Sequence, residues 1–208
     1  MKHLVVFALV FSALYSCTHQ EDRPLPILGN RSVSPSGDTI YPKIPDFAFV
    51  DQDSQLVTNA TFAGKIYVAD FFFTHCPTIC PKVKAQAMRI YEKYYGNPNV
   101  LLLSHSIDVK NDTVGQLHHY AQKMGIESAR WHLVTGDHDE IYGIADDYFS
   151  VATEDPSSPG GFDHSGRLIL VDINRHVRSF CDGTDPESVD KFMKDIDRLL
   201  AEQFPVKK

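Results

Sequence analysis

The sequence lacks a dense run of basic residues, and it lacks an apolar run long enough to cross a membrane. Its 208 residues carry 20 Lys and Arg against 27 Asp and Glu, a net charge of −7. Nucleic-acid binding needs clustered basic side chains that neutralise phosphates, so we expect no nucleic-acid partner. The longest apolar run, Leu4–Leu14, falls well short of the roughly 20 residues that a spanning helix needs.

The amino terminus has the pattern of an export signal. A short positive segment precedes the apolar run, which predicts a secretory signal peptide over residues 1–16. The next residues, Leu14-Tyr15-Ser16-Cys17, resemble a bacterial lipobox, in which cleavage before Cys17 leaves a lipidated cysteine. An ordinary signal peptide with an incidental Cys17 is the alternative. The lipobox predicts an exported, membrane-anchored lipoprotein that faces the periplasm or the cell exterior.

The rest of the chain divides into a linker and one domain. Residues 17–40 are polar and rich in proline and show no apolar period, so we expect the lipidated cysteine to be followed by a flexible tether. Residues 41–208 form the predicted domain, and an apolar share of 43% supplies its core. Outside the cytoplasm, a pair of thiols can persist as a disulfide.

The order of the expected elements is β-β-β-α-β-α-β-α-β-β-α. Strands are expected over 47–50, 55–58, 65–73, 100–107, 132–135, 167–173 and 177–181. Helices are expected from about 81 to 95, from the cap Asp112 to 124, from the cap Asp137 to 146, and from the cap Asp185 to 203. A loop rich in proline, serine and glycine is expected over about 153–165.

This order predicts an α/β fold, a mixed sheet flanked by helices on both faces. A buried strand that delivers a cysteine-containing loop into a helix is the arrangement of thioredoxin. We therefore expect a thioredoxin-like domain with an extra N-terminal β-hairpin, formed by the first two predicted strands.

Two cysteines, Cys76 and Cys80, lie at the start of the helix that follows the buried strand. Pro77 and Pro81 suit the first turn, where a missing backbone N–H costs no intrahelical hydrogen bond. The positive end of the helix favours the thiolate form. Positions i and i+4 share one side of a helix, so both sulfurs can bind one soft ion such as Cu(I) or close into a disulfide.

Two sulfurs leave a copper ion short of ligands, and ten histidines are available. His164 is the best candidate, because it lies in the loop directly before a predicted strand, and that loop should run beside the cysteine-bearing helix. A loop histidine bonded only to Asp163 is the alternative. The side chain of His75 should point away from the site. The other histidines considered are interpreted as surface or turn residues: His105, His118, His119, His132, His138 and His176. Cys181 is interpreted as a small buried apolar residue.

The chain resembles the Sco/SenC family of copper-binding proteins needed for cytochrome c oxidase assembly. The resemblance covers about residues 44 to 200. It rests on the segments Phe71–Pro81, Ser106–Asp108 with Asp112-Thr113, Leu133–Gly136, Asp163–Ser165 and Leu168–Asp172. The family usually has an aromatic residue where this chain has Cys181.

The resemblance implies that Cys76, Cys80 and His164 bind one copper ion, as Cu(I) or Cu(II), and that Asp163 orients His164. It implies a metallochaperone more than an enzyme. The implied partner is the copper-binding subunit of cytochrome c oxidase or another copper chaperone. The alternative is a thiol–disulfide oxidoreductase, in which Cys76 attacks and Cys80 resolves to reduce the cysteines of a copper-acceptor partner.

Overall fold

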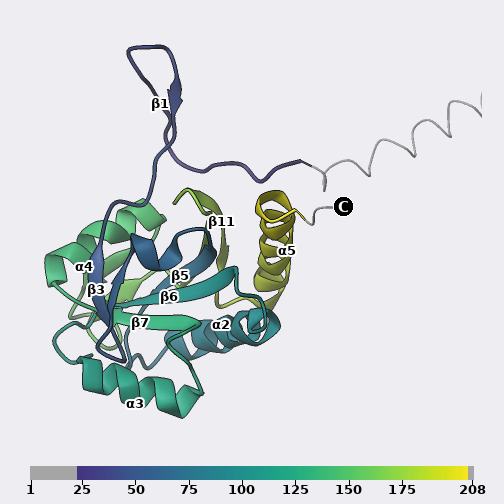
Figure 1. The fold of residues 1–208 in the computed structure, drawn as a ribbon. Coiled ribbons are helices and arrows are strands. Elements are labelled where there is room, and N and C mark those ends of the chain that lie inside the picture. The colour runs from purple at the N-terminus through teal and green to yellow at the C-terminus, as the bar shows by residue number, and fades with distance from the viewer. Residues whose placement is uncertain (1–22, 206–208) are drawn as a thin grey trace, which may run out of the picture.

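The computed structural model describes residues 23–205. The expected signal peptide over 1–16 and the lipid anchor Cys17 lie outside the described residues. A seven-stranded mixed sheet forms the centre of the domain, with the strand order β11-β10-β5-β6-β7-β3-β4 (Figure 1). The strands are β3 (Ala48–Asp51), β4 (Leu56–Thr58), β5 (Ile66–Phe72), β6 (Val100–Ser106), β7 (Trp131–Thr135), β10 (Arg167–Val171) and β11 (Val177–Asp182).

The two central strands, β5 and β6, are buried along their whole length. They pair in parallel over seven residues each, from Ile66 opposite Val100 to Phe72 opposite Ser106. Nearly continuous apolar sequence favours such a position, because helices cover both faces of a parallel pair. The carboxyl ends of both strands therefore lie at the same edge of the sheet.

Helices lie on both faces of this sheet, as expected. They are α2 (Cys80–Tyr94), α3 (Val114–Met124), α4 (His138–Ala145) and α5 (Pro186–Gln203), with the short 3-10 helices η2 (Asn59–Phe62) and η3 (Asp146–Tyr148). Side chains alternate between the two faces of a strand. Asp70 of β5 meets Lys84 of α2 on one face, whereas its neighbour Phe71 packs on Tyr148 of η3 on the other.

The caps of two helices are confirmed and that of a third is wrong. Asp137 caps α4 and Asp185 caps α5, each through its own carboxylate. At α3 the cap is Thr113, whose hydroxyl accepts from the backbone N–H of Gln116. Asp112 is instead fully buried, and its carboxylate binds groups of the segment that follows β5. A capping aspartate and a buried anchoring aspartate look alike in sequence.

Two N-terminal hairpins are present. The expected one, β3–β4, forms and joins the edge of the main sheet through β7. A second, β1–β2 (Ser32–Val33 and Thr39–Ile40), projects from the domain (Figure 1). It lies within the stretch expected to be a flexible tether, and so does Leu25, which is buried. Arg178 donates a 2.5 Å hydrogen bond to the Leu25 carbonyl, which fixes this stretch to the domain.

The segment expected as a loop over about 153–165 contains a further hairpin. Its strands are β8 (Ala152–Glu154) and β9 (Phe162–His164), which pair with each other and not with the main sheet. Short strands separated by proline, serine and glycine carry too little apolar alternation to be recognised in sequence. None of the helices in the described part of the chain has the length and apolar character needed to cross a membrane.

Candidate metal centre

The segment between β5 and α2 carries both cysteines of the predicted site. Cys76 lies in a turn in which its backbone N–H donates to the Phe73 carbonyl at 3.4 Å. Cys80 is the first residue of α2, which begins one residue before the start near 81 that the sequence predicts. Pro81 follows in the first turn, where its missing N–H leaves no bond unmade.

His164 reaches the cysteines from the β8–β9 hairpin. It lies in β9 opposite Ala152, so it is held by strand pairing and not by a loop. The ring of Phe73 meets the imidazole edge to face, with the ring centroids 5.8 Å apart. This aromatic contact connects the hairpin to the segment that carries Cys76.

The three predicted ligands come together in one cluster. Nε2 of His164 lies 3.0 Å from Sγ of Cys80 and 4.0 Å from Sγ of Cys76. All three donor atoms lie within 4.8 Å of one another. The residues are nearly buried, with exposed fractions of 8% for Cys76, 4% for Cys80 and 7% for His164. Two sulfurs and one imidazole nitrogen can thus bind one small ion that is shielded from bulk water.

The two thiols differ in acidity although they lie one turn apart. Burial acts to raise the pKa of Cys76, but hydrogen bonds from Cys80 and Thr78 outweigh it and hold that pKa below its ordinary value. One of them is the backbone N–H of Cys80, 3.4 Å from Sγ of Cys76. Burial raises the pKa of Cys80 well above the ordinary value. Burial also lowers the pKa of His164, which favours a neutral imidazole. Cys76 is therefore the residue that first becomes a thiolate.

The contact expected between Asp163 and His164 is not formed. Asp163 is exposed, and Nδ1 of His164 is buried without a hydrogen-bond partner among the described residues. Successive side chains of a strand point to opposite sides, so Asp163 in β9 points away from its neighbour. In the structure, Phe73 contributes to holding the imidazole.

Several polar residues behind the site were not recognised in the sequence. Lys84 lies one turn after Cys80 and is fully buried, 3.3 Å from Asp70 and 3.1 Å from the Ser104 hydroxyl. The indole N–H of Trp131 donates to the same hydroxyl at 2.8 Å. The signal available was the presence of polar residues inside the two predicted central strands, Asp70 in one and Ser104 in the other.

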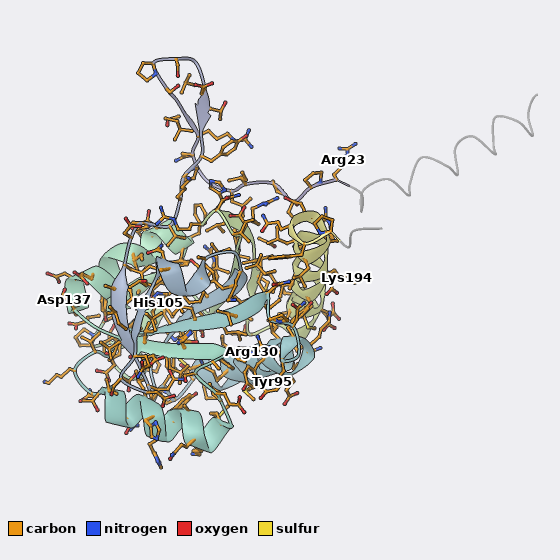
Figure 2. The ribbon with its side chains drawn as sticks, viewed as in Figure 1. Arg23, Tyr95, His105, Arg130, Asp137 and Lys194 are labelled. Carbon is orange, nitrogen blue, oxygen red and sulfur yellow. The ribbon has the colours of Figure 1, made fainter. Side chains whose placement is uncertain are left out.

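The surface assignments of the histidines are right for some and wrong for others. His118, His119 and His138 are exposed, as expected. His105 is fully buried, and Figure 2 labels it within the body of the domain, so its assignment is wrong. His132 is half-buried in β7, and His176, although only 9% exposed, lies in the connection between β10 and β11, as expected of a turn residue. Cys181 is buried as an apolar residue on β11, and burial raises its pKa to about 12.

Comparisons with known proteins identify a family and several solved structures that resemble this chain. The SCO1/SenC family model matches residues 37–201 of the chain. A SCO1/SenC family lipoprotein from Bacillus anthracis is 26% identical and superposes with a TM-score of 0.68, covering 76% of this chain and 94% of that one. The match supports the thioredoxin-like description of the sheet and its helices.

Two other solved structures resemble the chain. BsSco, described as having a disulfide switch and as a member of the Sco family of cytochrome c oxidase assembly proteins, is 26% identical; the match has a TM-score of 0.67 and covers 79% of this chain and 95% of that one. Arabidopsis thaliana ScoI, solved with copper bound, is 25% identical; that match has a TM-score of 0.61 and covers 74% of this chain and 98% of that one.

Proposed function

The chain belongs to the SCO1/SenC family, and we propose that it is a copper metallochaperone that holds one copper ion through Cys76, Cys80 and His164. The observation that carries this proposal is the cluster of two sulfurs and one imidazole nitrogen within 4.8 Å. Thiolates select Cu(I), and imidazole suits copper in either oxidation state. The copper-bound ScoI structure supports the choice of metal.

The residues of the site account for how copper is held and passed on. Metal binding requires deprotonated ligands and releases protons. Because the pKa of Cys80 is raised by burial, its thiol gives up a proton when the ion binds. A cysteine-bearing acceptor offers the same kind of ligand, so copper moves by exchange of one thiolate for another without a free ion.

The proposed acceptor is the copper-binding subunit of cytochrome c oxidase or another copper chaperone. The description of BsSco as an assembly protein of that oxidase supports it. We propose that the chain acts outside the cytoplasm as a lipoprotein anchored through Cys17. The lipobox-like segment and the description of the Bacillus anthracis relative as a lipoprotein support that location.

A thiol–disulfide oxidoreductase is the second candidate, and the unequal acidity of the two thiols favours it. The Cys76 thiolate would attack a partner disulfide, forming a mixed disulfide and releasing one partner thiolate. Cys80 would then displace the second partner sulfur. The chain would end with a Cys76–Cys80 disulfide; the two electrons and the Cys80 proton that it loses, with one further proton from water, would leave the partner with two thiols.

Replacement of His164 by alanine separates the two functions. Loss of a ligand should weaken copper binding by at least about 10-fold, since even the loss of a group behind a ligand costs that much. The rate of disulfide exchange with a model disulfide should change little, because both thiols remain. Copper affinity is measured by competition with a calibrated chelator, and His119→Ala is the control, since it removes an exposed imidazole from α3.

Two results would contradict the copper proposal. One is an unchanged copper affinity in His164→Ala. The other is one copper per chain still retained by Cys76→Ser, which would locate the ion elsewhere. An unaltered chain that exchanges disulfides but binds no measurable copper would favour the oxidoreductase.

A further inference from the structure

His75 is an exposed imidazole that directly precedes the nearly buried Cys76. Its Nδ1 lies 3.0 Å from Oγ1 of Thr74. Consecutive Cα atoms are about 3.8 Å apart, so the backbone of His75 lies directly beside that of Cys76, and the contact to Thr74 anchors its ring. The contact to Thr74 determines which ring nitrogen carries the proton.

Thr74 is itself held by a buried carboxylate. Asp112 is fully buried; its Oδ1 accepts from Oγ1 of Thr74 at 2.5 Å, and its Oδ2 accepts from the Thr74 backbone N–H at 3.0 Å. The Ser106 hydroxyl donates to the same Oδ2 at 2.6 Å. An ionised carboxylate can only accept hydrogen bonds, so the single hydroxyl proton of Thr74 is committed to Asp112.

In its other hydrogen bonds, Oγ1 of Thr74 must therefore be the acceptor. Nε2 of Gln116, which can only donate, lies 3.3 Å away. Nδ1 of His75 must likewise donate, so it carries the proton of the neutral ring. Nε2 of His75 is left with a free lone pair on an exposed side chain, the form in which imidazole binds a metal.

The buried position of the three-ligand cluster makes such a nitrogen useful. An ion brought by a partner meets exposed atoms before it meets Cys76, Cys80 and His164. Over residues 74–80, His75 is the only residue besides the two cysteines whose side chain has a nitrogen or sulfur atom. We propose that Nε2 of His75 is a receiving ligand, which binds Cu(I) transiently before the ion passes to the buried cluster; this inference rests on the proposed copper function.

The step is a ligand exchange and involves no electron transfer. A bond from His75 Nε2 to Cu(I) forms as one bond to the delivering ligand breaks, and no proton leaves His75, because Nε2 carries none. The Cys76 thiolate and the sulfur of Cys80, whose proton goes to water, then replace the remaining delivering ligand. His75 leaves the ion when His164 binds, so it is absent from the final ligand set.

The test is the rate at which the reduced full chain takes Cu(I) from its bicinchoninate complex in anaerobic stopped-flow experiments. His75→Ala should slow uptake about 10-fold, within the range over which association rates vary among related variants. The equilibrium affinity for Cu(I) should stay within about twofold, because the three final ligands remain. His119→Ala, which also removes an exposed imidazole, should load at the rate of the unaltered chain.

A second pair of variants tests the role of the hydroxyl. Thr74→Val keeps the imidazole and removes the oxygen that orients it, and it should slow uptake by a few-fold, whereas Thr74→Ser should restore the rate. If His75→Ala loads as fast as the unaltered chain, the receiving role is wrong while the copper function stands. An equal loss of affinity in that variant would make His75 a permanent ligand and would also overturn the role. An unaltered chain that takes up no Cu(I) overturns the proposed function and this inference together.

Discussion

Cys76 and Cys80 show how much the acidity of two thiols can differ although they are only four residues apart. Cys80 lies deeper, at the start of α2 and 3.0 Å from Nε2 of His164, and burial penalises its charged form. Sγ of Cys76 accepts a hydrogen bond from the backbone N–H of Cys80 and lies 3.8 Å from Oγ1 of Thr78. These contacts stabilise a negative sulfur, so the first negative charge of the pair belongs on Cys76.

Alkylation of the reduced, metal-free protein checks this order. The reaction requires the thiolate, and a lowered pKa means that the thiolate of Cys76 is populated at lower pH than that of an ordinary cysteine. Iodoacetamide should therefore modify Cys76 first, with a midpoint below pH 9, while Cys80 reacts only at higher pH. Peptide mapping by mass spectrometry identifies each site.

The control for this experiment is Cys181, whose buried thiol has a pKa raised to about 12 and should stay unmodified in the folded chain. Cys181→Ala should leave the order of reaction unchanged. Modification of Cys80 before Cys76 would contradict the assignment.

The site residues differ in how well the sequence could predict them. Cys76 and Cys80 are four residues apart where a strand leads into a helix, and this spacing predicts that their sulfurs meet, although only Cys80 lies in α2. His164 depends on how the β8–β9 hairpin packs, so it needed a fold-level argument. His105 was wrongly assigned to the surface: its strand, β6, is buried on both faces, but a histidine is a poor indicator of burial on its own.

At the scale of elements, helix α2 carries a charge into the core directly behind the metal centre. Lys84 lies 3.3 Å from Asp70 of β5 and 4.0 Å from the centre of the Phe72 ring. Removing one partner of a buried ion pair leaves the other charge without compensation in a medium of low polarity. The pair therefore ties α2, and with it the cysteine segment, to the central sheet.

Replacement of Lys84 by methionine should lower the free energy of unfolding by about 3–5 kcal/mol, because Asp70 then stays buried without its cation. The control is Lys93→Met on the same helix: Lys93 pairs with Asp197 at the surface, and exposed pairs contribute only about 0–1 kcal/mol. Urea denaturation followed by the fluorescence of Trp131 measures both. Equal, small effects in the two variants would show that the buried pair does not hold α2 in place.

The elements that the sequence predicted are those with strong local patterns. Strand β5 is apolar except for Asp70, β6 begins with four apolar residues, and α5 begins with a capping aspartate followed by Pro186. Hairpins β1–β2 and β8–β9 were missed, because their strands have only two or three residues each. The position of β8–β9 depends on tertiary contacts, such as that of Phe73 with His164.

At the scale of the whole molecule, a buried histidine lies among aromatic rings, away from the metal centre. The metal centre lies beyond the end of β5, where the chain leaves the sheet for α2. His105 lies on the face opposite α2, stacked on Phe71 with the ring centroids 4.7 Å apart and packed against Phe49 and Tyr148. Its Nδ1 is 3.4 Å from the Asp70 carbonyl, and its Nε2 has no partner among the described residues.

Burial lowers the pKa of His105 from 6.5 to about 4, so the folded chain resists protonation that the unfolded chain accepts. The contribution of His105 to the free energy of unfolding is complete above pH 6.5 and is lost as the pH falls from 6.5 to about 4. The total loss is at most about 3 kcal/mol. Chemical denaturation across this range should show a slope that His105→Phe flattens and that His118→Gln, at an exposed site, leaves intact. A slope unchanged in His105→Phe would mean that other groups cause the acid sensitivity.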